Sequence, residues 1–152
     1  MSKILVTALA VCVGLAGSGA PGAAGLFSAS GNVIAILADE LFVGEAEGHL
    51  SGAGTLAIRS QKTPGLSCLG TFTSSAQLGG SGHMSCSDGT TATFQFQRLS
   101  IFRGYGVGHS SRGSMSFAYG FAPHEAGSYL KLPEGKKLSH NGTELMLADL
   151  QE

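Results

Sequence analysis

The chain has no tryptophan, few charged residues and no apolar run long enough to span a membrane. Charged residues make up 12% of its 152 residues, and the formal net charge is −1. The only basic cluster is Lys131, Lys136 and Lys137, and Glu134 interrupts it. Proteins that bind nucleic acid carry lysines and arginines clustered on one face. The composition therefore argues against nucleic acid as a partner, and the lysine cluster is typical of a solvated surface.

Motifs that indicate catalysis or a bound metal are also missing. No two of the five histidines are two, three or four residues apart, so no local metal-binding motif exists. No Gly-x-Ser-x-Gly turn lies between a strand and a helix. We expect no catalytic residue, no metal and no cofactor. A site near Asp88, His83 and His109 is the alternative, and it requires the fold to bring these three into one pocket.

The same three residues have simpler interpretations. Asp88 precedes Gly89, which is typical of a turn stabilised by the aspartate side chain. His83 and His109 follow glycine clusters, as does Thr55 after a third cluster. Their equivalent positions favour a repeated place on a strand over a ligand-binding role.

Glycine is abundant, at 24 residues, but follows no triplet period, which excludes a collagen-like chain. It costs roughly 1 kcal/mol against alanine inside a helix. Period-two alternation recurs instead in short runs separated by turn residues. Eight strands are predicted, at residues 32–37, 41–47, 54–59, 67–73, 82–86, 91–98, 101–108 and 114–119. They predict a mainly β fold, an antiparallel meander that forms either a curved sheet or a small barrel.

Turn and helix signals complete the outline. Residues 38–40, 62–65, 79–80 and 87–89 are predicted turns. After Gly120 we expect a short helix within residues 121–130, with Pro123 in its first turn. A hairpin is predicted over residues 137–147, because Asn141-Gly142 is a strong two-residue turn signal.

Three glycine clusters, at residues 52–54, 80–82 and 104–108, recur at intervals near 26 to 28 residues. Glycines on one face of a strand permit sharp coiling or close packing of an aromatic ring from a neighbouring strand. A phosphate-binding loop is the alternative, but it needs a following helix, and strand-like sequence follows each cluster. The aromatic residues of the later strands are expected to supply the core and one apolar contact face: Phe94, Phe96, Phe102, Tyr105, Phe117 and Tyr119.

The three cysteines indicate the compartment. Cys68 and Cys86 lie in strand-like runs and predict one cross-strand disulfide, which is typical of exported proteins. Residues 1–24 have the layout of a signal peptide: a positive start, thirteen mostly apolar residues at 4–16, and a small-residue segment. We therefore expect a signal peptide at 1–24 and a single β-rich domain at 25–152. A lipid on Cys12, or a retained leader, would instead tether the protein to a membrane.

The stretch from Leu41 to Leu138 resembles a group of small exported bacterial proteins of no known activity. Five segments carry the likeness: VGEA at 43–46, CLGTF at 68–72, CSDG at 86–89, GYGVG at 104–108 and YLKLPEGK at 129–136. The resemblance implies an envelope location and a β-rich domain.

These observations favour an exported, non-enzymatic β-domain in the periplasm or cell envelope of a bacterium. Low charge and many small residues are typical of a surface that a partner covers, so we expect it to bind a protein as an accessory structural subunit of an envelope assembly. The alternatives are a small periplasmic hydrolase or ligand carrier, and a membrane-tethered lipoprotein.

Overall fold

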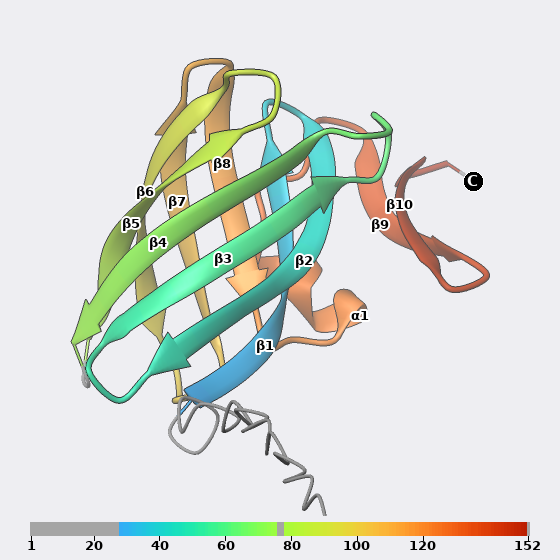
Figure 1. Cartoon of the computed structure of the whole chain (residues 1–152). Helices are drawn as coiled ribbons and strands as arrows, with labels where there is room; N and C mark the ends of the chain where they lie inside the picture. Colours follow the sequence, from blue (N-terminus) through green and yellow to red (C-terminus); the bar gives the residue numbers. More distant parts are fainter. Residues whose placement is uncertain (1–27, 76–77, 152) are drawn as a thin grey trace, which may run out of the picture.

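The computed structural model describes residues 28–75 and 78–151. Eight antiparallel strands form a closed barrel in which each strand pairs with the next in sequence, and β8 pairs back with β1 (Figure 1). The barrel consists of β1 (Ser28–Leu37), β2 (Glu40–His49), β3 (Ala53–Ser60), β4 (Ser67–Ser75), β5 (Gly79–Cys86), β6 (Thr91–Arg98), β7 (Gly104–Ser110) and β8 (Gly113–Tyr119). The predicted antiparallel meander is confirmed, and it closes into a barrel.

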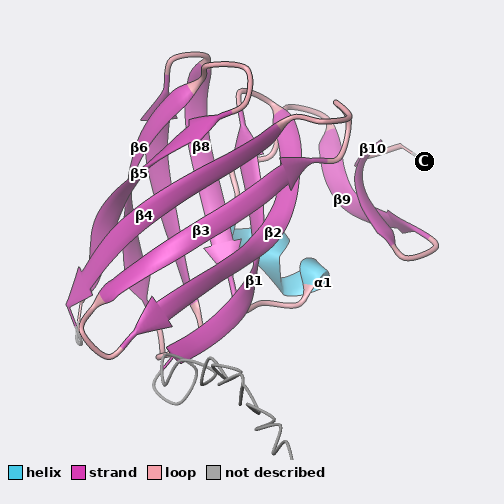
Figure 2. Ribbon diagram, in the orientation of Figure 1, coloured by secondary structure: helices cyan, strands magenta, loops and turns pink. Residues whose placement is uncertain are grey.

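A short C-terminal segment follows the barrel (Figure 2). It contains α1 (Pro123–Ala126), the 3₁₀ turn η2 (Gly127–Tyr129) and a hairpin of β9 (Lys136–Asn141) and β10 (Glu144–Asp149). Phe121, Ala126, Leu130 and Leu145 of this segment form a buried cluster with outward-facing residues of β1, β2 and β8. The C-terminal segment therefore covers one side of the barrel. The predicted helix and hairpin are both confirmed.

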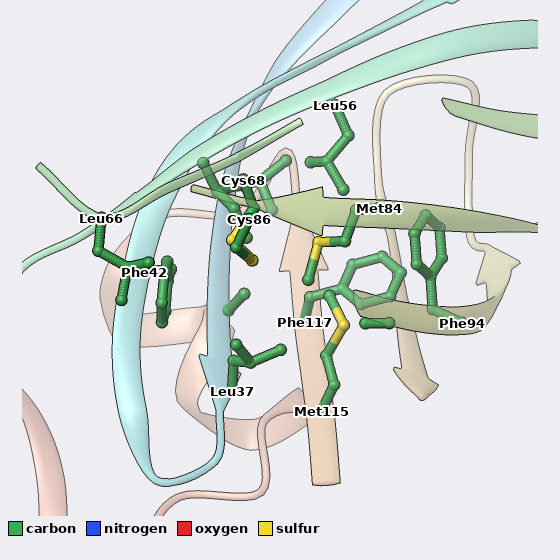
Figure 3. Close-up of a cluster of buried hydrophobic side chains, with 14 of the residues drawn as sticks. Leu37, Phe42, Leu56, Leu66, Cys68, Met84, Cys86, Phe94, Met115 and Phe117 are labelled. Atoms are coloured by element: carbon green, nitrogen blue, oxygen red, sulfur yellow. A yellow bond between two sulfur atoms is a disulfide. The ribbon is translucent and has the colours of Figure 1, made fainter. Parts of the chain in front are cut away.

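Side chains alternate between the barrel interior and its outer face, as the two-residue period of a strand requires. In β6, Phe94 and Phe96 are buried inside, whereas Thr93 and Gln95 are exposed outside. Figure 3 shows Leu37, Phe42, Met115 and other side chains converging in the core. The buried core comprises Val33, Ala35, Leu37, Phe42, Leu56, Ile58, Leu66, Cys68, Met84, Cys86, Ala92, Phe94, Phe96, Met115 and Phe117.

Inward-facing glycines give aromatic rings the room to pack. A Cβ atom on Gly54 would lie 2.1 Å from Cζ of Phe72, and one on Gly82 would lie 2.5 Å from Cζ of Phe94. Real Cβ atoms essentially never approach that closely. The predicted aromatic packing against glycine is therefore confirmed, and strand follows each cluster.

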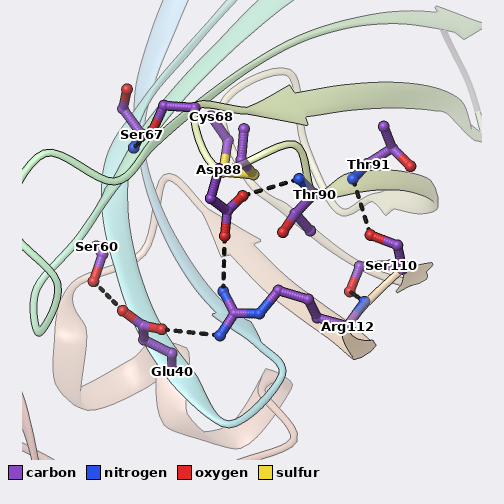
Figure 4. Close-up of a disulfide and its surroundings, with 12 residues drawn as sticks. Glu40, Ser60, Ser67, Cys68, Asp88, Thr90, Thr91, Ser110 and Arg112 are labelled. Carbon is purple, nitrogen blue, oxygen red and sulfur yellow. Dashed lines mark hydrogen bonds and ion pairs between the residues drawn. A yellow bond between two sulfur atoms is a disulfide. The ribbon is translucent and has the colours of Figure 1, made fainter.

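A disulfide, ion pairs and hydrogen bonds connect the loops at one end of the barrel (Figure 4). Cys68 and Cys86 form a disulfide between register partners of β4 and β5. Arg112, in the β7–β8 turn, lies 3.5 Å from a carboxylate oxygen of Glu40 and 3.5 Å from one of Asp88. Glu40 also accepts hydrogen bonds from the hydroxyls of Ser60 and Thr63. These contacts link four loops at this end, which we call the closed end.

Two of the expected turns differ in the structure. Gly79 and Gly80 begin β5 and form no turn, and a Cβ on Gly80 would lie 1.9 Å from the carbonyl oxygen of Thr73. Close strand packing therefore explains this glycine. The hairpin turn consists of Gly142 and Thr143, because Asn141 already pairs with Glu144.

Several of the expected strand boundaries also move, by one to four residues. The first strand begins at Ser28, four residues earlier than predicted, because residues 28–31 pair with the far end of β2. The strand predicted over 101–108 begins only at Gly104. The carbonyl of Arg103 accepts hydrogen bonds from the backbone N–H groups of Leu99 and Ser100, which closes residues 99–103 into a loop.

Two of the six aromatics that were expected to supply the core and a contact face lie outside the core. Phe102 belongs to that loop and is 59% exposed. Tyr105 faces outward from β7 and packs against Tyr129, with ring centroids 4.9 Å apart. Phe102 leaves the core because it lies in the loop. Tyr105 does so because the inward positions of β7 are glycines, at 104, 106 and 108.

Candidate functional site

A cavity of about 670 Å³ opens at the end of the barrel opposite the disulfide, the lower end in Figure 1. Residues 28–30, 49–52 and 98–102 surround its opening, which we call the mouth. Five aromatic side chains line the walls: Phe72, Phe94, Phe96, Phe117 and Tyr119. An eight-stranded barrel is just wide enough for side chains to fill it or for one small ligand to bind.

Small inward-facing residues explain why this end is hollow. Gly31, Ala46 and Gly48 line the cavity from β1 and β2. The corresponding inward positions near the closed end carry Leu37 and Phe42, which are fully buried. The same two strands therefore fill one end of the barrel and leave space at the other.

The aromatic walls hold one another in place. The rings of Phe72 and Phe96 meet edge to face with centroids 5.5 Å apart, and those of Phe94 and Phe117 do so at 5.3 Å. Edge-to-face packing is the favoured geometry for aromatic pairs. The apolar surface is thus preorganised before any ligand enters.

Arg98 and Tyr119 are the largest polar side chains that line this cavity besides His49, and five serines line it as well. Arg98 is half-buried at the end of β6, and its guanidinium donates to the carbonyl oxygens of Ser75 and Ile101 at 3.4 and 3.5 Å. Burial raises the pKa of Tyr119, and the nearby Arg98 charge partly offsets this effect. The phenol is therefore protonated at neutral pH. The ion pairs found within the described residues do not include Arg98.

Large apolar side chains are exposed around the mouth. They come from the β2–β3, β4–β5 and β6–β7 connections, with exposed fractions between 54% and 80%. We call them the apolar rim: Leu50, Leu78, Leu99, Ile101 and Phe102.

His83 and His109 lie in one row on the outer face of the barrel. Register pairing places Thr93 between them and Thr55 in the same row, which confirms their repeated strand position. Neighbouring strands are about 4.8 Å apart, so the two histidines are separated by roughly 10 Å. Both border a shallow hollow of about 1020 Å³ that crosses the outside of β3 to β8.

The structure does not bring Asp88 to these histidines. Asp88 lies in the β5–β6 turn at the closed end and does not line the outer hollow. The backbone N–H of Thr90 donates to its carboxylate at 2.9 Å, which with Arg112 nearby lowers its pKa. Among the described residues, no three or more His, Cys, Asp or Glu side chains are placed to hold a metal ion.

Sequence reasoning missed Arg98 and the rim. The alternation that places Phe94 and Phe96 inside continues to Arg98, so an inward-facing cation was detectable. The rim was hidden because part of the β6–β7 loop was interpreted as strand.

Comparison with known protein families, with curated protein sequences and with solved structures finds no match for this chain. The resemblance to small exported bacterial proteins therefore stays a prediction. In the described part of the chain, every helix is too short or too polar to cross a membrane. The predicted signal peptide at 1–24 and Cys12 lie outside the described residues.

Proposed function

We propose that the barrel binds one small amphiphile, with its apolar part inside the cavity and an anionic head group at Arg98. The observation that carries this proposal is an aromatic-lined cavity of about 670 Å³ that opens at the barrel end opposite the disulfide. Small-molecule sites are typically concave and mostly apolar, occupy about 300–1,000 Å³ and contain few polar groups. The cavity has this size and mostly apolar walls, and its polar groups are Arg98, Tyr119, His49 and five serines, at 28, 30, 51, 74 and 100.

The apolar walls favour a hydrocarbon or aromatic moiety. Each buried CH₂ group contributes about 0.8 kcal/mol through removal from water. The rings already pack against one another, so binding requires little reordering of the walls.

The polar end favours an anion. Arg98 presents a permanent positive charge at the mouth, and the protonated hydroxyl of Tyr119 is a second donor. A guanidinium matches the geometry of a carboxylate and can bind it through two hydrogen bonds. An amphiphile with a carboxylate head and a single apolar chain satisfies both parts of the cavity.

The proposal corresponds to a ligand carrier, but with its site in the barrel interior, away from His83 and His109. Export to the periplasm or envelope is part of the proposal, and the disulfide is compatible with it. An accessory role in an envelope assembly remains a separate prediction.

Filling the cavity tests the proposal. Ala46→Phe places a ring in the cavity, whereas Ala57→Phe makes the same change on the exposed outer face of β3. We expect Ala46→Phe to weaken the binding of a dansyl-labelled undecanoic acid at least about tenfold, measured by fluorescence titration, and Ala57→Phe to leave it unchanged. Equal affinities for both variants, or no binding by the native protein, would refute the proposal.

Arg98→Gln tests the head-group assignment in the same titration. A hydrogen bond to a charged group contributes about 1.5–3 kcal/mol, so the acid should bind about tenfold more weakly or worse. The methyl ester of the same probe has no negative charge, so the native protein and the Arg98→Gln variant should bind it with equal affinity. If Arg98→Gln weakens the binding of the acid and of its ester equally, the head group does not bind at Arg98.

A further inference from the structure

We propose that the apolar rim docks the mouth of the barrel onto a lipid bilayer that carries anionic head groups. The inference extends the proposed function, because a bilayer is where a carrier would collect an amphiphile. Docking itself does not require an occupied cavity, so the two proposals are tested separately.

The distribution of exposed apolar side chains carries the first step. Nine large hydrophobic side chains are exposed among the described residues, and five of them form the rim at a single end of the barrel. Exposed apolar residues scattered singly are ordinary, but a contiguous group marks an interaction surface. Three separate connections contribute to the group, so it is not confined to one edge of the opening.

The distribution of charge carries the second step. The loops of the mouth, residues 49–52 and 98–103, contain Arg98 and Arg103 and no carboxylate. Arg103 lies 3.8 Å from Glu125 of α1, whereas Arg98 has no carboxylate partner among the ion pairs of the described residues. Between residues 48 and 124 the sequence has one acidic residue, Asp88, and it lies at the closed end. Among the described residues, the loops of the mouth therefore expose apolar side chains and one guanidinium without a carboxylate partner, that of Arg98.

An apolar rim with a cationic side chain beside it fits an anionic bilayer. Leucine, isoleucine and phenylalanine partition into the boundary between head groups and acyl chains, while arginine keeps its guanidinium among the phosphates. Basic residues near an anionic surface add to the affinity for the membrane. A bilayer also leaves the cavity open to a lipid molecule, whereas a protein bound to the same rim would close it.

The experiment compares two double variants of the full chain in a vesicle co-sedimentation assay. Ile101→Ser with Phe102→Ser removes two exposed side chains of the rim. Leu69→Ser with Val107→Ser removes two exposed side chains of the outer face, which are 69% and 51% exposed. All proteins share one N-terminus, so the variants differ only in the side chains that are replaced. The vesicles contain phosphatidylcholine either alone or mixed with phosphatidylglycerol.

We expect the native protein to bind the mixed vesicles more tightly than phosphatidylcholine alone, and added salt to weaken the binding. The rim variant should bind about tenfold more weakly, because partial burial of two apolar side chains contributes about 1.4 kcal/mol or more. The outer-face variant should bind like the native protein. Equal vesicle binding by both variants would overturn the proposal. So would a native protein that does not bind the mixed vesicles, or a rim that binds a protein of the envelope and no lipid.

Titration with the soluble dansyl-labelled probe separates this inference from the proposed function. Leu78→Ser serves as the rim variant in this titration, because Leu78 belongs to the rim but does not line the cavity. It should weaken vesicle binding and keep the native affinity for the probe. Rim-dependent vesicle binding without any probe binding would refute the carrier and leave docking in place. Probe binding without rim-dependent vesicle binding would refute docking alone.

Discussion

Replacing Gly54 by alanine should destabilise the barrel, because no Cβ atom fits between β3 and the ring of Phe72. The added atom would lie 2.1 Å from Cζ of Phe72 and 2.5 Å from the carbonyl oxygen of Glu47, whereas carbon atoms normally pack at about 3.5–4.0 Å. The ring of Phe72 packs against Phe96, and the carbonyl of Glu47 is held by the pairing of β2 with β3. Neither group can therefore move away from the added Cβ atom. Overpacking of this kind costs about 1–3 kcal/mol.

Gly48 provides a matched control. It is the register partner of Gly54 and faces the same ring, but its Cβ would lie 3.7 Å from Cζ of Phe72, an ordinary contact. Gly48→Ala should therefore be neutral, or stabilising by about 0.4–1 kcal/mol through reduced entropy of the unfolded chain. The two alanine variants should therefore differ by about 1–4 kcal/mol in the free energy of unfolding, with Gly54→Ala the less stable and lower in Tm.

Urea and thermal unfolding, followed by circular dichroism, measure the difference. Adding Phe72→Leu to Gly54→Ala should recover part of the loss, and a double-mutant cycle should show a favourable coupling of about 1 kcal/mol. If Gly54→Ala and Gly48→Ala unfold at the same urea concentration, the glycine does not make room for the ring, and the explanation of the glycine clusters is wrong.

Two further predictions concern the closed end. Reducing the disulfide should lower the free energy of unfolding by about 3 kcal/mol, and an unchanged urea midpoint would contradict its stabilising role. Burial raises the pKa of Glu40, but hydrogen bonds from Ser60, Thr63 and Arg112 lower it more, so that it lies below its ordinary value of 4.5. The ionised carboxylate of Glu40 therefore stabilises the fold fully at pH values above its ordinary pKa of 4.5. This stabilisation is lost as the pH falls through the lower pKa of the folded state. Glu40→Gln should cost about 1–2 kcal/mol at neutral pH, with the difference narrowing on acidification in pH-dependent urea titrations; a difference that stays constant down to about pH 3 would contradict this.

Much of the fold was predictable because its signals are local. Alternation located β6 to the residue, and the pairing of Cys68 with Cys86 followed from two strands joined by a short connection. Residues 33–37 are buried throughout, which agrees with their unbroken apolar run. Errors arose where glycine has two uses: Gly79 and Gly80 serve close strand packing in place of a turn.

The candidate site was harder to predict because it depends on residues distant in sequence. Ala46 and Gly48 leave space only where aromatic rings from β4, β6 and β8 surround them. Arg98 becomes a cavity residue because its strand ends at the mouth. The rim joins Leu50 to Phe102, and no local pattern relates residues so far apart in the chain.

Local residue patterns by themselves determined the strands, the disulfide and the match between glycines and aromatic rings, because each depends on alternation or on neighbouring strands. Only the tertiary structure decided that β1 pairs with β8, where Val33 meets Tyr119, and thereby closes the sheet into a barrel. Closure of the barrel brings the ends of all eight strands together. Side chains fill the closed end, and the mouth at the other end opens into the cavity. No local pattern encodes which side chains share an end, since this follows from strand length, register and tilt acting together.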